Sequence, residues 1–134
     1  MELFYAAYAL EFKYPFGLAH GSRTYTDVVY ARLTQDGLSG YGEAALPPYL
    51  GETQSSVIAF FKKASETVKN CKLPFSVEEI VSKINLIETG NTAAKAALDI
   101  ALYDLLGKFT NKPVYELLEI EKPQPKDTSV TISI

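Results

Sequence analysis

The fold of this chain is decided by residues 24–44, which read T-Y-T-D-V-V-Y-A-R-L-T-Q-D-G-L-S-G-Y-G-E-A. The first part, from about Thr24 to Leu33, is rich in Thr, Tyr and Val, and these residue types favour β-strands. Gln35-Asp36-Gly37 makes a good hairpin turn, because glycine accepts a positive φ at little cost. Leu38 to Ala44 then returns as a second strand. The stretch therefore predicts an antiparallel hairpin.

A longer strand precedes this hairpin. From Phe4 to Lys13 the residues alternate at period two, so that one face is expected to carry Phe4, Ala6, Tyr8, Leu10 and Phe12. Proline and glycine residues then interrupt the pattern and predict a loop from about Tyr14 to Arg23. The strands together predict an antiparallel meander, one face of which must be covered by helices.

Helical spacing replaces strand spacing after a Pro-rich loop, Leu46 to Gly51. Thr53 can cap a first helix, whose apolar stripe is expected to be Val57, Phe60, Phe61, Ala64 and Val68. Ser76 and Glu79 have the spacing of a capping box and predict the start of a second helix.

A third helix is predicted from Asn91 or Thr92 to Gly107, which is well placed as a left-handed terminator. Its apolar side is expected to consist of Ala94, Ala97, Leu98, Ala101, Leu102 and Leu105. Pro113 suits the first position of a short helix that ends at Leu118. We therefore predict the α+β class, with an antiparallel meander of three strands followed by a helical bundle.

Strand spacing returns at the C-terminal end of the sequence. In Lys126 to Ile134, apolar residues alternate with Ser and Thr, which indicates a half-buried strand. An uncovered strand edge promotes association with other chains, so we expect these residues to belong to a larger protein. The expected organisation is one domain at 1–122, then a proline-stiffened linker and the first strand of a second domain at 123–134.

Composition excludes several classes of function. The net charge is −3 with both signs interspersed, which predicts no nucleic-acid partner. No apolar run approaches the length of a membrane helix, and the N-terminal residues lack the features of a secretory signal. The single cysteine, Cys71, allows no intramolecular disulfide. A cytoplasmic protein with no membrane partner is expected.

Few residues could carry chemistry. Arg23 lies among aromatic residues of the predicted loop, where a guanidinium can bind a carboxylate, although a solvated surface arginine has the same pattern. Thr131 is open to the same two interpretations, ligand binding or solvation. Glu43 could hold the following loop by accepting backbone N–H bonds, or act in catalysis. His20 has no neighbouring metal ligands and no acid–base pair is assembled, so we expect no catalytic residue and no metal ligand in this chain.

The third-helix segment carries a family resemblance. Residues 91–118, N-T-A-A-K-A-A-L-D-I-A-L-Y-D-L-L-G-K-F-T-N-K-P-V-Y-E-L-L, and the first 44 residues resemble the N-terminal capping domain of the enolase superfamily, in its muconate-lactonizing and mandelate-racemase-like branch. The resemblance implies that residues 1–122 cap a (β/α) barrel whose first strand lies within 123–134. One departure is Glu119-Ile120, where the family often has glycine.

The loops carry a narrower resemblance. Pro15-Phe16, Gly21-Ser22-Arg23-Thr24 and Tyr49-Leu50-Gly51-Glu52-Thr53 are similar to the loops of dipeptide epimerases that close over the barrel mouth. The resemblance implies inversion of the α-carbon of a dipeptide's C-terminal residue, with substrate contacts from Arg23, Thr131, Phe16 and Tyr49. It also implies a Mg²⁺ cofactor bound by the barrel, and lysine bases encoded after Ile134.

Other interpretations stay open at the level of the sequence. The same branch includes cycloisomerases, N-acylamino-acid racemases and o-succinylbenzoate synthases, although the Gly21-Ser22-Arg23-Thr24 loop argues against them. A free-standing α+β interaction module without an active site is an alternative of a different class. The leading interpretation implies a dipeptide substrate and a C-terminal barrel domain as partners. The resemblance also implies that the protein associates with copies of itself as a homo-oligomer.

Overall fold

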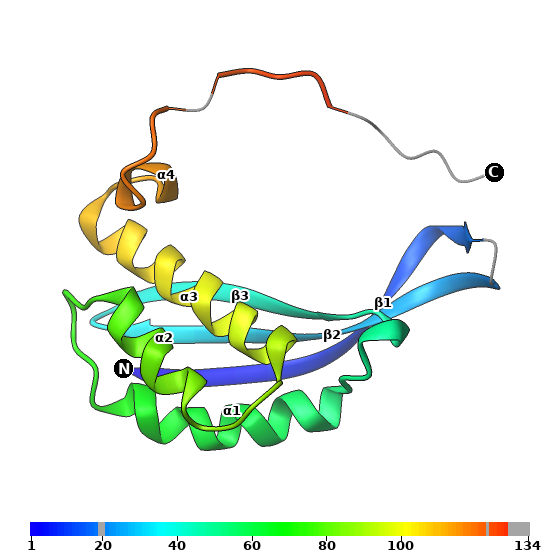
Figure 1. The fold of residues 1–134 in the computed structure, drawn as a ribbon, viewed down its shortest axis with the longest axis horizontal. Coiled ribbons are helices and arrows are strands. Elements are labelled where there is room, and N and C mark those ends of the chain that lie inside the picture. Colours follow the sequence, from blue (N-terminus) through cyan, green and yellow to red (C-terminus); the bar gives the residue numbers. More distant parts are fainter. Residues whose placement is uncertain (19–20, 123, 129–134) are drawn as a thin grey trace.

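The computed structural model describes residues 1–18, 21–122 and 124–128. Its three-stranded antiparallel sheet has the order β1-β2-β3 and consists of β1 (Glu2–Leu18), β2 (Gly21–Gln35) and β3 (Leu38–Leu46). A 3₁₀ helix, η1 (Pro48–Leu50), precedes α1 (Gln54–Lys69), α2 (Val77–Asn85), α3 (Thr92–Thr110) and α4 (Val114–Leu117). Helices α1 to α3 cover one face of the sheet (Figure 1).

The predicted α+β class is therefore confirmed, as is the order of a meander followed by helices. The strand predicted at the C-terminal end lies largely outside the described residues, and 126–128 belong to no helix or strand.

One hydrophobic core joins the helices to the sheet. The apolar stripes predicted for the first and third helices are buried in full. From the sheet, the buried core residues are Val29, Ala31, Leu33, Ala44 and Leu46. In β1, Leu3 and Tyr5 pack on this core, whereas the rings of Phe4 and Tyr8 are about half exposed, 45% and 52%. The other face of the sheet is thus open and aromatic.

The closest packing in the core brings strand backbone against helix backbone. Gly40 and Gly42 on β3 face α3, where a Cβ would overlap the carbonyl oxygens of Ala101 and Ala97, respectively. At Gly40 the added carbon would also lie 2.6 Å from the Leu105 Cβ. Only glycine on the strand, opposite small residues on the helix, allows this approach.

Side chains of α3 also cover the outer edge of β3, which is an edge strand. The Asp104 carboxylate accepts a hydrogen bond from the Tyr41 backbone N–H at 2.8 Å, and Lys108 Nζ donates to the Ser39 carbonyl oxygen at 2.8 Å. Asp104 and Lys108 also pair with each other at 2.6 Å. An ion pair four residues apart on a helix thus blocks part of a sheet edge that could otherwise pair with another chain.

The predicted loop from Tyr14 to Arg23 is wrong. β1 and β2 continue as a hairpin in which Phe16 lies opposite Arg23. The register shifts between Glu11 and Phe16, and Pro15 falls in this irregular stretch. A bulge tolerates proline because the missing N–H interrupts no regular ladder of hydrogen bonds.

The predicted end of the third helix is also wrong. α3 continues past Gly107 to Thr110, and Asn111 with a left-handed φ of 52° caps it. Asparagine enters this region more readily than most residues. Gly107 instead makes room for the chain, because a Cβ there would lie 2.9 Å from the Lys112 carbonyl oxygen. Glu119 has a φ of 54°, so this turn keeps the conformation that glycine favours.

The capping box predicted for the second helix is only half formed. Ser76 Oγ accepts from the Glu79 N–H at 3.1 Å, but its hydroxyl donates to the Glu78 carboxylate. The reciprocal pair occurs at α1, between Thr53 and Ser56.

The glycine contact generates the first prediction. Gly42→Ala should lower the free energy of unfolding by at least about 2 kcal/mol, because the new methyl group meets backbone that cannot move aside as a side chain would. The measurement is urea unfolding followed by circular dichroism. Gly17→Ala is the matched control: among the described residues nothing lies within 4 Å of its Cβ position, and stability should change by less than about 1 kcal/mol. Equal stability of the two variants would contradict the packing role of Gly42.

Candidate functional site

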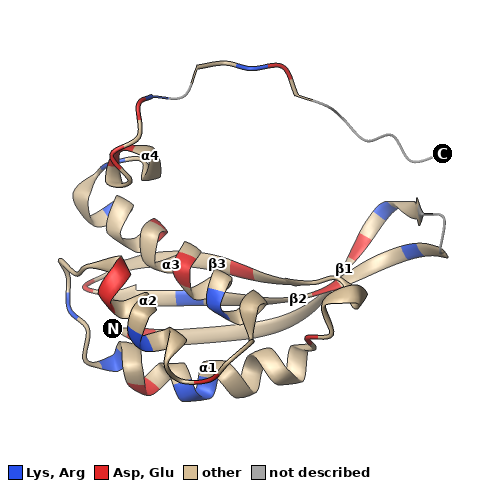
Figure 2. Cartoon of the chain, viewed as in Figure 1, with Lys and Arg blue, Asp and Glu red and all other residues tan. Residues whose placement is uncertain are grey.

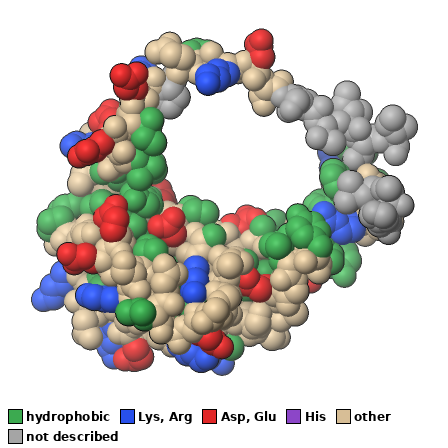
Figure 3. Space-filling model, viewed as in Figure 1, with side chains coloured by type: hydrophobic (Ala, Val, Ile, Leu, Met, Phe, Trp, Pro, Cys, Tyr) green, Lys and Arg blue, Asp and Glu red, His purple; other side chains and the backbone are tan. Residues whose placement is uncertain are grey.

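Two segments of the chain border one end of the sheet. The β1–β2 hairpin projects past the helices at the end where η1 follows β3 (Figure 1). A cavity of about 320 Å³ is lined by hairpin residues 22–27 and by Leu46 and Pro48. Hydrophobic side chains gather near the base of the hairpin (Figure 3). We take the cavity and the two segments that border it as the candidate site.

Arg23 is held by aromatic rings. Its Cζ lies 5.9 Å from the ring centroid of Phe12 and 5.8 Å from that of Phe16, and the two rings are in contact edge to face at 6.4 Å. These distances are within the range of cation–π attraction. Among the described residues the guanidinium makes no ion pair. Its side chain is half-buried and lines the cavity.

Of the other predicted site residues, one contacts Arg23, one lies near the cavity without lining it, and one is not described. Phe16 contacts Arg23, so these two are brought together. Tyr49 lies on η1 and is 82% exposed; its neighbour Pro48, not Tyr49 itself, lines the cavity. Thr131 and His20 lie outside the described residues.

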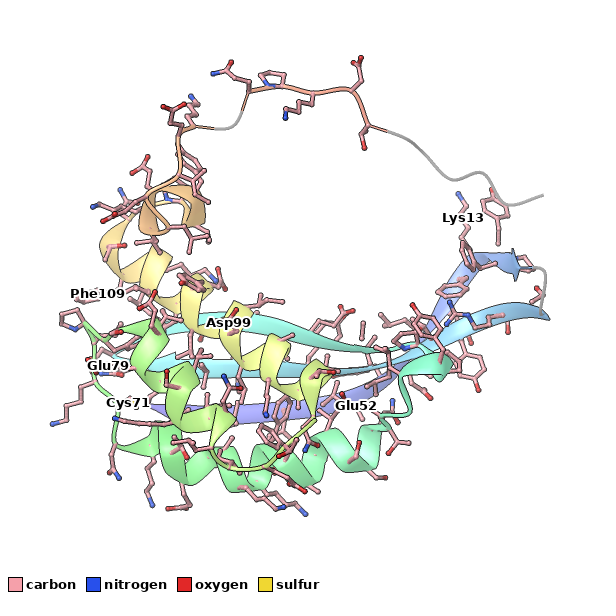
Figure 4. The ribbon with its side chains drawn as sticks, in the orientation of Figure 1. Lys13, Glu52, Cys71, Glu79, Asp99 and Phe109 are labelled. Atoms are coloured by element: carbon pink, nitrogen blue, oxygen red, sulfur yellow. The ribbon has the colours of Figure 1, made fainter. Side chains whose placement is uncertain are left out.

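Glu52 ties the end of the η1 segment to α3. Its carboxylate accepts from the Thr92 hydroxyl at 2.7 Å and from the Ala93 N–H at 3.1 and 3.2 Å. Figure 4 shows Glu52 beside the first turn of α3. Asn91, the N-cap residue, makes no side-chain capping bond, so a carboxylate from a distant segment fills that role. Negative charge at a helix N-terminus is favourable because it faces the positive end of the helix dipole.

The next two residues tie the same segment to other elements. Thr53 caps α1. Gln54 Nε2 lies 2.9 Å from the Tyr8 carbonyl oxygen, 3.3 Å from that of Val28 and 3.4 Å from Asp27 Oδ1. The amide group is therefore positioned to bridge β1 and β2 at the base of the projecting hairpin.

The loop-holding role that the sequence favours for Glu43 over a catalytic one is filled by another carboxylate. Glu43 lies opposite Tyr30 on the exposed face of the sheet, where desolvation and the Glu43 carboxylate raise the pKa of Tyr30. Next to the η1 segment, the carboxylate that accepts a backbone N–H is Glu52, and the donor is Ala93. The signal available in the sequence was a loop acid just before a helix cap, but its partner is 41 residues away.

Charge and metal-ligand patterns are unremarkable in the described part of the chain. Positive and negative side chains are interspersed over the helices and the sheet (Figure 2). Within residues 1–18, 21–122 and 124–128, no group of three or more His, Cys, Asp or Glu side chains could hold a metal ion. No helix in these ranges is long and apolar enough to cross a membrane.

The meander and its helical layer are the arrangement that the resemblance to enolase-superfamily N-terminal domains implies. A family model described as mandelate racemase / muconate lactonizing enzyme, N-terminal domain, matches residues 1–119. The chain belongs to this family. The resemblance inferred from its third helix and its loops is thereby confirmed.

Individual relatives agree with this assignment. The chain is 40% identical over 134 residues to an L-Ala-D/L-Glu epimerase of Bacteroides thetaiotaomicron. The matched region is all of this chain and 34% of that protein. A crystal structure of a dipeptide epimerase from Enterococcus faecalis, complexed with Mg and L-Leu-L-Tyr, matches with a TM-score of 0.77 at 32% identity over 87% of this chain and 33% of that one. The chain thus spans about a third of the length of these relatives.

The stacked arginine generates the second prediction. Phe16→Leu should move the side-chain Hδ resonances of Arg23 downfield, because the ring current that shields them is lost, and should cost about 0.5 kcal/mol of stability. The measurement is a ¹H–¹³C correlation spectrum, which is simple for residues 1–134 because Arg23 and Arg32 are the only arginines among them. Phe4→Leu is the control, since the Phe4 ring lies 4.8 Å from Arg32 and its loss should move only the Arg32 signals. An unmoved Arg23 signal would rule out the stacking.

Proposed function

We propose that residues 1–122 are the capping domain of a Mg²⁺-dependent dipeptide epimerase, and that 123–134 lead into the (β/α) barrel that carries the chemistry. The observation that supports this most strongly is the 40% identity to an L-Ala-D/L-Glu epimerase along the whole chain. A solved relative that binds Mg and a dipeptide has the same fold at a TM-score of 0.77.

The proposed reaction inverts one α-carbon of the dipeptide. A base removes the α-proton of the C-terminal residue, and a second acid on the opposite face returns a proton to the same carbon, so that substrate and product have the same composition. The α-proton is a very weak acid because its loss adds negative charge beside a carboxylate. A water-poor site strengthens the electrostatic stabilisation of that charge. The contribution of this chain is to cover the site and to select the substrate.

The four predicted site residues receive roles within this proposal. Arg23 binds the substrate carboxylate or a carbonyl through its guanidinium N–H groups. Phe16 keeps Arg23 in place and excludes water. Tyr49, exposed on η1, contacts the dipeptide from the second segment, and Thr131 does so from the first barrel strand.

The metal ion is assigned to the barrel. The described residues of this chain offer no cluster of metal ligands, so the donors are expected in the sequence that follows. A Mg²⁺ ion held there would supply positive charge that stabilises the negative charge developing on the substrate. We also propose a cytoplasmic location, with which the one half-buried free cysteine, Cys71, is consistent. A homo-oligomeric state is a further part of the proposal.

The domain assignment is tested by the nucleotide sequence beyond the codon for Ile134. A strand with lysines at alternate positions should follow within about one βα unit, roughly 30 residues, and spaced acidic residues should follow on later strands. A stop codon directly after Ile134 would overturn the proposal.

Arg23 generates the third prediction. Arg23→Met should lower kcat/KM for dipeptide epimerisation about thirty-fold, because a hydrogen bond to a charged partner contributes about 2 kcal/mol. The measurement is deuterium incorporation at the α-carbon in D₂O with Mg²⁺. Arg32→Met is the matched control, because Arg32 is also stacked on a phenylalanine of β1 but lies on the open face of the sheet. Equal activity of both variants would remove Arg23 from the site.

A further inference from the structure

We propose that Glu52 and Gln54 are positioning residues that fix the η1 segment and the β1–β2 hairpin relative to each other, and so set the affinity and selectivity for the substrate. This inference rests on the proposed function, because it assigns a role to residues around the same cavity. Neither side chain lines that cavity. Both would therefore act through the residues that they hold.

Glu52 holds the η1 segment from its C-terminal end. Gly51, with a left-handed φ of 72°, ends η1, so Glu52 is only three residues from the proposed substrate contact Tyr49. The bonds from Glu52 to the first turn of α3 fasten the turn at Gly51 to the helix that packs most closely on β3. Without them, η1 would be attached on that side only by Thr53 and the start of α1.

Gln54 holds the hairpin at its base. One amide group faces the carbonyl oxygens of Tyr8 and Val28 and the carboxylate of Asp27. Asp27 itself lines the cavity, and the hairpin beyond it carries Arg23. Because the hairpin projects past the helices (Figure 1), its direction depends on contacts at this base.

The two ties are separated by one residue, Thr53, which caps α1 through Ser56. Three successive side chains thus connect to α3, to α1 and to the β1–β2 pair. A shift of this tripeptide would move both segments, and the proposed barrel residues that carry the chemistry are not among its partners. The geometry therefore predicts an effect on KM and on selectivity between dipeptides, with little effect on kcat.

The test compares Glu52→Ala, Glu52→Gln, Gln54→Ala and Ser76→Ala in the full protein. KM for the preferred dipeptide should rise about tenfold in Glu52→Ala and about fivefold in Gln54→Ala, with kcat changed less than about twofold. Glu52→Gln should recover part of the loss, because its amide oxygen still accepts the Ala93 N–H. Ser76→Ala is the control of matched kind: it removes a helix cap at a comparable cost in stability but should leave KM unchanged.

Hydrogen–deuterium exchange provides a readout that does not depend on activity. Glu52→Ala should speed exchange at the amides of residues 49–51, since Pro47 and Pro48 have no amide hydrogen. Gln54→Ala should speed exchange in residues 21–28, while Ser76→Ala should affect only the region of α2. If the wild-type protein epimerises no dipeptide, the proposed function fails, and the exchange pattern then decides alone whether these residues hold the two segments. The inference is overturned if KM and local exchange match the wild type, or if Ser76→Ala has the same effects.

Discussion

The structure depends on one steric constraint, the direct contact of the β3 backbone with the α3 backbone at Gly40 and Gly42. A helix usually stands off a sheet by the length of its side chains, but here the absence of Cβ atoms removes that spacing. The contact therefore fixes both the distance of α3 from β3 and its position along the length of the strand. Asp104 and Lys108 on the same helix then reach around the sheet edge to hydrogen-bond Tyr41 and Ser39. The glycines thus make the protection of the edge possible.

The same constraint reaches the candidate site through the N-terminus of α3. Because the helix cannot slide along β3, its first turn has a fixed place next to the chain that leaves the strand after Leu46. Glu52 uses that turn as an anchor, and Gln54 links the same stretch to the hairpin. The two segments that border the cavity are thus connected to the core by polar contacts. Such contacts are individually weak, so the position of these segments can change without a change in the packing of the core.

Local patterns in the sequence predicted the strands, the hairpin turn, the helix stripes and the cap at Thr53, because each depends on neighbouring residues. The errors have separate physical origins, two in local geometry and one in a contact that is distant in sequence. Gly107 looked like a helix terminator, but the space that it leaves is used by the Lys112 carbonyl. Glu43 looked like the loop-holding acid, but the available N–H groups belong to α3 and face Glu52. The hairpin beyond Glu11 was missed because a bulge hides its alternation.

Aromatic stacking is a suitable way to hold an arginine that binds a ligand. A guanidinium paired with a protein carboxylate would have to break that ion pair before it could bind a substrate carboxylate. The protein carboxylate would then be left without a partner, which is unfavourable. Contacts with the Phe12 and Phe16 rings hold the guanidinium without pairing it to a carboxylate. Stacking alone does not indicate function, since Arg32 lies over Phe4 in the same way on the open face of the sheet. What distinguishes Arg23 is that its stacked position borders a cavity whose two bordering segments are both anchored by residues 52–54.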